Sequence, residues 1–225
     1  MTFSITGYCD RTKMTGVAIT TSSICVASRC PWVRAGVGAV ATQNITDPSL
    51  GPLILDYLQA GDTAAEAIEK VTRNREFIAY RQLTVVDIQG NTAQYTGDEI
   101  LGTHAVVTGK HCVAAGNLLS STSVPQAMAD SFNNHADLHL AERLLTALAA
   151  GVSAGGEEGP THSSGLKVAH QHPWPLVDLR IDWSEGEPVS ELMQLWKTYE
   201  PQVADYTARA IDPTAAPSYG VPGDL

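Results

Sequence analysis

Residues 2–9, TFSITGYC, predict a strand that starts with the second residue of the chain. Small or apolar residues alternate with polar ones from Phe3 to Cys9. This two-residue period is typical of a half-buried strand. The polar turn Asp10–Lys13 and the apolar run Gly16–Ile19 follow. The sequence therefore predicts a β-hairpin at its N-terminus.

Outward from the hairpin, strand signals alternate with pairs of helix signals. The run AGVGAVATQ (35–43) predicts a buried strand whose glycines allow close approach of other backbone. Asp47-Pro48 predicts the start of one helix, and Thr63-x-x-Glu66 forms a capping box for a second. Further strands are expected over 83–87, 104–108, 112–115, 166–170 and 176–181, and further helices over 123–133, 138–150 (closed by Gly151) and 188–210.

This order of elements predicts the fold class and the domain organisation. Antiparallel strands that alternate with helix pairs favour two sheets packed face to face with helices outside, an α+β arrangement. No polar linker interrupts the middle of the chain. We therefore expect one domain over residues 1–210, followed by an irregular tail over 211–225.

Composition excludes several classes of partner. The 225 residues include 14 Lys and Arg against 24 Asp and Glu, a net charge of -10, which opposes binding to a phosphate backbone. There is no signal-peptide pattern and no apolar stretch of about 18 residues. Four cysteines without a CxxC pair favour buried thiols over disulfides. We expect a cytoplasmic protein that binds neither nucleic acid nor membrane.

Two motifs that suggest a cofactor or a metal are incomplete. The glycines of AGVGAV do not complete GxGxxG, and no helix signal follows them directly. His135-x3-His139 offers two imidazoles at helical spacing, but Ala136 replaces the Glu of HExxH and no third ligand is indicated. The sequence predicts no cofactor and no metal.

The N-terminus offers a specific chemistry. A small second residue such as Thr2 permits removal of Met1, and the freed α-amine has a lower pKa than a lysine. That amine can act as the general base for the hydroxyl of its own residue. Many cytosolic proteins begin with Met-Thr, so this feature has to be weighed with others.

Several segments, in this order, resemble the family called domain of unknown function 1028. They are MTFSI (1–5), GVAITTSS (16–23), PWVRAGVGAVATQ (31–43), the GN of AAGNLL (114–119), AERLLTALAAG (141–151), GGEEG (155–159) followed by HSSGL (162–166), and VDLRID (177–182). The resemblance spans about residues 1–195. That family is similar to the N-terminal-nucleophile (Ntn) hydrolases, which implies a four-layer αββα sandwich and an N-terminal Thr.

The resemblance also implies roles for individual residues. Thr2 is the expected nucleophile, Asn117 the oxyanion-hole donor, and Thr21 the polar residue beside the terminal amine. Substrate-binding roles are expected for Arg34, Gln43, Ser163 and His162. The pattern of proteasome-like relatives is not complete, because the chain has Thr21 where they carry an acidic residue and has no lysine in AGVGAVATQ.

Two functions follow from this interpretation. The first is an amidohydrolase that cleaves a C–N bond of a small amide, ureide or cyclic amide through Thr2. The alternative is a catalytically inactive small-molecule-binding or regulatory module on the same fold, which the missing lysine and acid favour. A homodimer is also expected, because the last helix signal carries the large apolar residues Leu192, Leu195, Trp196 and Tyr199.

Overall fold

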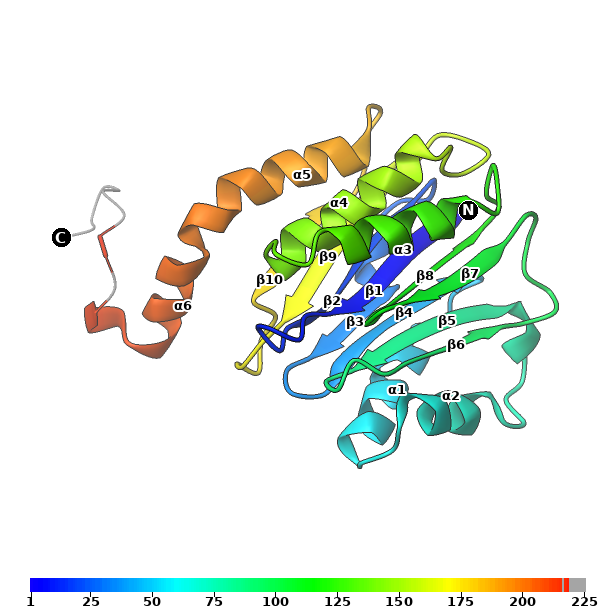
Figure 1. Cartoon of the computed structure of the whole chain (residues 1–225), viewed down its shortest axis with the longest axis horizontal. Coiled ribbons are helices and arrows are strands. Elements are labelled where there is room, and N and C mark those ends of the chain that lie inside the picture. The colour runs from blue at the N-terminus through cyan, green and yellow to red at the C-terminus, as the bar shows by residue number, and fades with distance from the viewer. Residues whose placement is uncertain (216, 219–225) are drawn as a thin grey trace.

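The computed structural model describes residues 1–215, 217 and 218, so part of the tail expected over 211–225 lies outside the described residues. It is a mixed α/β structure with two antiparallel sheets (Figure 1). The strands are β1 Thr2–Tyr8, β2 Thr15–Thr21, β3 Pro31–Arg34, β4 Gly38–Asn44, β5 Arg81–Asp87, β6 Thr92–Thr96, β7 Ala105–Gly109, β8 Cys112–Asn117, β9 Ser163–Ala169 and β10 Val177–Ile181. The α-helices are α1 Leu50–Gln59, α2 Ala64–Thr72, α3 Val124–Asn134, α4 Leu140–Ser153, α5 Pro188–Tyr199 and α6 Val203–Ile211.

The predicted N-terminal hairpin is confirmed and lies at the centre of the larger sheet. The six-stranded sheet has the order β10-β9-β2-β1-β8-β7, and the four-stranded sheet has the order β3-β4-β5-β6. β1 pairs with β2 on one side and with β8 on the other, and all seven of its residues are buried. The first residues of the chain therefore form the middle of the structure.

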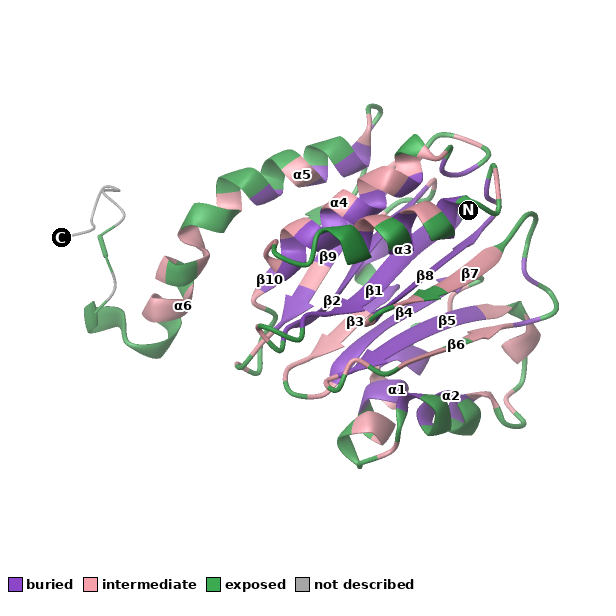
Figure 2. Cartoon of the chain, in the orientation of Figure 1, coloured by how far each residue is buried: buried purple, intermediate pink, exposed green. Residues whose placement is uncertain are grey.

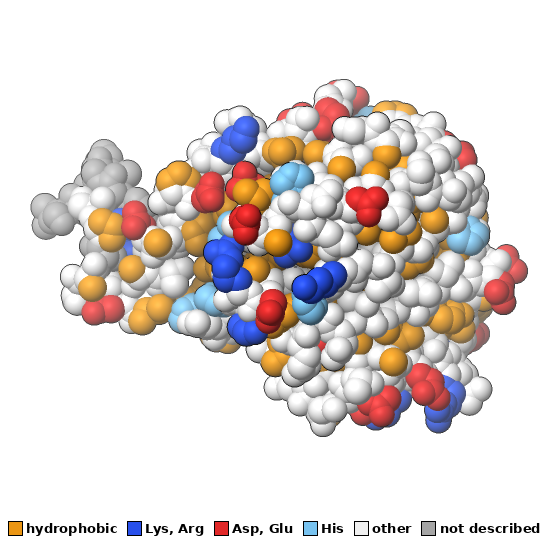
Figure 3. Space-filling model, viewed as in Figure 1, with side chains coloured by type: hydrophobic (Ala, Val, Ile, Leu, Met, Phe, Trp, Pro, Cys, Tyr) orange, Lys and Arg blue, Asp and Glu red, His pale blue; other side chains and the backbone are white. Residues whose placement is uncertain are grey.

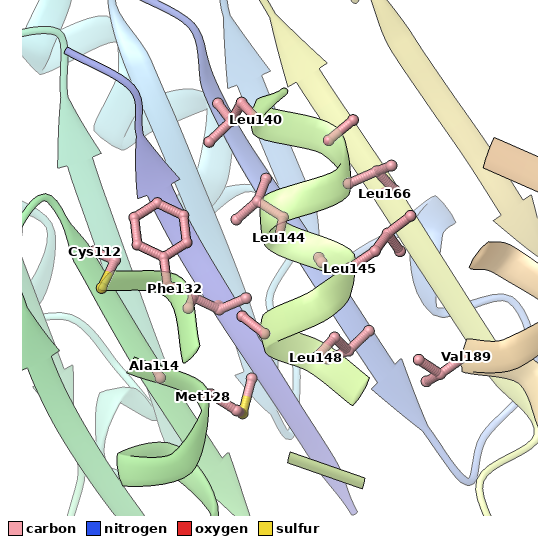
Figure 4. Close-up of a cluster of buried hydrophobic side chains, with 14 of the residues drawn as sticks. Cys112, Ala114, Met128, Phe132, Leu140, Leu144, Leu145, Leu148, Leu166 and Val189 are labelled. Atoms are coloured by element: carbon pink, nitrogen blue, oxygen red, sulfur yellow. The ribbon is translucent and has the colours of Figure 1, made fainter. Parts of the chain in front are cut away.

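Helices α3, α4 and α5 cover one face of the six-stranded sheet, and α1 and α2 pack on the four-stranded sheet (Figure 1). Phe132 of α3 and Leu144 and Leu148 of α4 pack onto the strands (Figure 4). Gly7 of β1 is needed there, because a Cβ atom at this position would lie 2.6 Å from the Phe132 ring. Figure 2 shows that the central strands are almost entirely buried, as expected for strands that lie between the helices and the second sheet.

The two sheets also face each other. Tyr8 and Val17 of the larger sheet pack against Ala39, Ala41 and Val86 of the smaller one. The apolar packing lies at one end of this interface, and polar side chains fill the other end. On the face seen in Figure 3, acidic and basic side chains are interspersed among apolar ones.

Several predicted boundaries are wrong for identifiable reasons. The helix expected over 188–210 is divided by a 3₁₀ turn at Glu200–Gln202, because Pro201 has no N–H to continue the ladder. Helix α6, which has no buried residue, extends away from the body (Figure 1). Gly151 does not close α4 but packs inside it against Phe3 and Met128.

Other local expectations have mixed outcomes. The capping box of Thr63 and Glu66 is confirmed, whereas α1 begins at Leu50 rather than directly after Asp47. His135 and His139 do not share a helix face, because one follows α3 and the other caps α4. All four cysteines are free thiols. Within residues 1–215, 217 and 218, no helix has the length and apolar character to cross a bilayer.

Candidate functional site

The polar end of the inter-sheet space is built by the alternation of β1. Phe3 and Ile5 belong to the core under the helices. Thr2, Ser4 and Thr6 face the opposite way because side chains alternate along a strand. Ser4 Oγ donates a 2.6 Å hydrogen bond to Gln43 Oε1 of β4, and Thr6 and Thr84 of β5 share one of 2.8 Å. Polar side chains of β1 therefore meet polar side chains of the smaller sheet.

Thr2 and Thr21 are brought together at the polar end of this space, where both are buried. They face each other in the β1–β2 register, and their Oγ1 atoms are 3.1 Å apart. Both hydroxyls donate to the carbonyl oxygen of Met1, from Thr2 over 2.6 Å. Thr2 is only 6% exposed. In the chain that retains Met1, the Met1 carbonyl thus occupies the space beside both hydroxyls.

Asn117 lies on the other side of Thr2. It is the last residue of β8, and it pairs with Thr2 in the β1–β8 register. Its Nδ2 donates to Gln82 Oε1 over 3.3 Å, and Gln43 Nε2 donates to the same oxygen over 2.7 Å. Within the described part of the chain, Asn117 Oδ1 is buried without a hydrogen-bond partner.

A buried network of this kind is costly to form. Unpaired buried polar atoms lose their hydration without compensation, so structures seldom contain them without a functional reason. Gln82, which joins Gln43 to Asn117, had no role in the sequence analysis. A signal for it was present in the sequence, because the polar residues Gln82 and Thr84 alternate with the apolar residues Leu83 and Val85.

Two of the expected substrate-binding residues lie next to Thr21 but bind other groups. The backbone N–H of His162 donates to Thr21 O over 2.8 Å, while its ring stacks on Trp183 at 4.4 Å. Ser163 pairs with Thr21 in the β2–β9 register, and its Oγ donates to Ser23 O over 2.6 Å. Ser163 thereby holds the loop that follows β2, whereas the ring of His162 packs on the segment that follows β10.

Arg34 is not brought to this site. Its guanidinium forms an ion pair with Asp56 at 2.8 Å and donates to Gln59 over 2.7 Å, both on α1. Arg34 pairs with Gly38 at the start of β4, and Gln43 lies five residues further along that strand, about 16 Å away.

A different arginine, Arg29, lies near Thr21. Its Nη2 donates to Ser23 Oγ over 2.9 Å, and that oxygen is 3.2 Å from Thr21 Oγ1. Nothing in the sequence distinguished Arg29 from other loop cations, because its position depends on how the loop after β2 folds back.

Glu157 is a second residue for which the sequence analysis assigned no role. It follows the glycine pair at the end of α4, forms an isolated bridge with Leu119, and is buried. Burial raises the pKa of its carboxyl group to about 8; the positive charge of the N-terminus, and then the N–H and hydroxyl dipoles of Ser22, act in the opposite direction. Glu157 also lines a cavity of about 270 Å³ with Phe3 and Gly159.

A match between this sequence and a protein-family model identifies the family. Residues 2–192 match a family described as "Family of unknown function (DUF1028)". The chain belongs to this family. Every residue of the network between Thr2 and Ser163 lies within the matched range, and the resemblance to DUF1028 is thereby confirmed.

A solved structure of the same family is similar over most of this chain. The crystal structure of the DUF1028 protein SPO2555 from Silicibacter pomeroyi is 33% identical, with a TM-score of 0.84, over 91% of this chain and 89% of that one. Anbu (ancestral beta-subunit) from Yersinia bercovieri is 11% identical, with a TM-score of 0.40, over 92% of this chain and 97% of that one. No curated protein matches the sequence. The DUF1028 description names no activity.

Proposed function

We propose that this DUF1028 protein is an N-terminal-nucleophile amidohydrolase that cleaves a C–N bond of a small amide, ureide or cyclic amide. One observation carries the proposal: the Thr2 hydroxyl, at the second residue of the chain, lies 3.1 Å from Thr21 Oγ1 and directly opposite Asn117. A hydroxyl between a hydrogen-bonding partner and an amide donor is the arrangement that acyl transfer needs.

The chemistry begins with removal of Met1. While Met1 is present, the nitrogen of Thr2 is part of a peptide bond and cannot accept a proton. Hydrolysis of that bond frees the α-amine, which takes the proton of the Thr2 hydroxyl as the oxygen attacks the substrate carbonyl. The tetrahedral intermediate then expels the amine product, which leaves with the proton, and an ester to Thr2 remains. Water hydrolyses this ester and restores the hydroxyl.

Asn117 and Thr21 support these steps in the proposal. The Asn117 Nδ2 group donates one hydrogen bond to Gln82 and has a second hydrogen for an anionic oxygen. The Thr21 hydroxyl orients the Thr2 side chain. Arg29, linked to Thr21 through Ser23, is the cation placed to attract a substrate carboxylate.

We also propose a layer arrangement, a cellular location and a set of partners for this protein. Two facing sheets with helices packed on each support a four-layer αββα sandwich of the Ntn-hydrolase type. We propose a cytoplasmic homodimer with a small-molecule substrate, without nucleic acid or membrane as partners. The exposed Leu195 of α5 and the absence of buried residues in α6 support the dimer.

The test combines mass analysis with a screen of amides, lactams and ureido acids. The intact protein should lack Met1, and Thr2→Ala should abolish turnover of any substrate found, while Thr2→Ser should keep part of it. Thr6→Ala, which removes a hydroxyl from the same face of β1, is the matched control and should remain active. A chain that retains Met1 and still turns over substrate would rule out the mechanism.

The alternative function is a small-molecule-binding or regulatory module without catalysis. It is favoured by one observation: the network of Thr2, Thr21, Gln43, Gln82 and Asn117 contains no lysine to lower the pKa of the nucleophile. This alternative predicts that a ligand binds without turnover and with the same affinity whether or not Met1 is present. Calorimetry on both forms of the chain separates the two functions.

A further inference from the structure

The loop after α4 is shaped so that Glu157 reaches the start of β1. Gly155 and Gly156 have φ values of 114° and 57°, a region that favours glycine. Gly156 N donates to Gly151 O over 3.0 Å, and Glu158 N donates to Leu118 O over 3.0 Å. The chain therefore turns back sharply and runs beside the segment that follows β8.

The location of Glu157 follows from two strand registers. Asn117 pairs with Thr2, and Leu119, two residues further on, pairs with Glu157. The side chain of Met1 lies over the same loop, since a Cβ atom on Gly159 would be 3.5 Å from Met1 Cε. Glu157 and Gly159 thus flank the end of β1 from which Met1 projects.

The carboxylate of Glu157 has no cation within hydrogen-bond distance among the described residues. Neither oxygen accepts a hydrogen bond of ordinary length, although the N–H and hydroxyl of Ser22 favour its charged form, and the residue is 6% exposed. A buried carboxylate is strongly destabilised unless a cation or several donors face it. The N-terminal ammonium group is the cation whose charge acts most strongly on Glu157. A carboxylate that lacks a cation and lies beside the chain terminus points to the terminus as its partner.

We propose that Glu157 is a positioning residue: in the chain that begins at Thr2, its carboxylate is the counter-ion of the Thr2 α-amine and holds that amine beside the Thr2 hydroxyl. The inference rests on the removal of Met1, as the proposed function does. Removal moves the terminal amine along β1 by one residue, about 3.8 Å between Cα atoms, and takes away the Met1 side chain over Gly159.

The pairing solves a problem that burial creates for the base. An amine at the buried position of Thr2 has a lowered pKa because burial disfavours its charged form. A carboxylate nearby acts in the opposite direction and favours the charged form. A general base is most effective when its pKa lies near the working pH. Glu157 therefore keeps the Thr2 amine basic enough to accept the hydroxyl proton.

Other titratable groups near the terminus are engaged elsewhere or exposed. Glu187, in the same cavity, accepts from Ser190 N over 2.7 Å, and His162 Nδ1 lies 2.8 Å from Ser184 O. Burial raises the pKa of the Cys30 thiol, which also feels the terminal charge. Glu158 is exposed beside Glu157 and serves as the matched control.

The experiment measures the pKa of the α-amine and does not depend on turnover. The full chain beginning at Thr2 is released from an N-terminal fusion by a site-specific protease. The rate at which acetic anhydride acylates the α-amine is followed against pH by mass spectrometry of the N-terminal peptide. Glu157→Gln should lower the pKa of the amine by about one unit. Glu158→Gln should leave the pKa of the amine unchanged. Glu157→Asp should give a pKa between those of the wild type and Glu157→Gln.

Equal pKa values in wild type, Glu157→Gln and Glu158→Gln would overturn the inference. If Glu157→Gln does not fold, the pairing can be tested in the wild-type chain, where carbon-13 NMR measures the pKa of the Glu157 carboxyl group. Acetylation of the Thr2 amine removes its charge and should raise the pKa of Glu157, and an unchanged pKa would reject the pairing. The two proposals can also fail separately. If Glu157→Gln shifts the amine pKa but Thr2→Ala keeps its turnover, the proposed mechanism is rejected and the pairing of Glu157 with the amine stands.

Discussion

Thr2 Oγ1 and Thr21 Oγ1 lie 3.1 Å apart because the hairpin register places the two residues opposite each other. A slip of one residue in that register would turn Thr2 toward the helices and Phe3 toward the smaller sheet. The seven paired positions of β1 and β2 resist such a slip, since Phe3 and Ile5 would leave the core. The position of the candidate nucleophile is therefore fixed by the hydrophobic pattern around it.

The hydroxyl of Thr21 should be necessary for turnover. Thr21→Val keeps the shape of the side chain and removes the group that contacts Thr2, so kcat should fall about 10²-fold, whereas Thr21→Ser should retain most activity. Thr20→Val is the control, because Thr20 Oγ1 donates to Ser163 O on the other face of β2. It should lower the free energy of unfolding by about 1 kcal/mol and leave kcat unchanged. Full activity of Thr21→Val would contradict the assignment.

Loss of the Asn117 amide should affect kcat more than KM. Asn117→Ala removes the proposed oxyanion donor, and kcat should fall about 10²- to 10³-fold. Asn117→Asp replaces that donor with an anion at the same place and should lose at least as much. Steady-state kinetics with a substrate from the screen provides the measurement. A change confined to KM would show that Asn117 only binds the ground state.

The glycine turn that presents Glu157 should tolerate no side chain. Gly155→Ala adds a Cβ atom 2.4 Å from Ser120 Oγ at a φ of 114°. Gly61→Ala is a matched control, because its φ is 101° and its Cβ would meet nothing within 4 Å. Urea unfolding should show that Gly155→Ala costs at least about 1 kcal/mol more than Gly61→Ala. Equal losses would mean that the loop can move away from Ser120.

The stability of the chain that retains Met1 should depend on pH through Glu157. Burial raises the pKa of this group from 4.5 to about 8 on folding, so the folded state binds more protons between these values. The free energy of unfolding should therefore fall as the pH rises from 4.5 to 8. Glu157→Gln should have a higher Tm than wild type at pH 9 and an equal Tm at pH 4. Parallel Tm profiles would show that Glu157 is solvated in solution.

The proposed dimer should be tested at Leu195 rather than at Trp196. Trp196 is 3% exposed and stacks on His139 at 5.1 Å, so a charge there would disrupt the core. Leu195 is 36% exposed on the outer side of α5. Light scattering should give a dimer mass at micromolar concentration and a monomer mass for Leu195→Glu. Phe77→Glu, at an exposed position outside the helices, should remain dimeric, and a monomeric wild type would reject the dimer.

Features that depend on residues close together in the chain could be predicted from the sequence. The alternation from Phe3 to Cys9 was sufficient for the first strand, and the capping box of Thr63 and Glu66 was readable because its atoms lie three residues apart. The segments that resemble DUF1028 were enough to predict the family to which the chain belongs. The spacing of apolar residues and the capping of helices involve residues that are close in the chain, so both can be read from the sequence.

The contacts between polar residues of the candidate site depend on how distant strands and loops pack. Gln82 joins Gln43 to Asn117 because two sheets face each other, and Arg29, not Arg34, lies near Thr21 because the loop after β2 folds back. Glu157 comes to pair with Leu119, just after β8, through the turn at Gly155 and Gly156. Such pairings depend on the packing of distant strands and on the desolvation it brings, which no local pattern encodes.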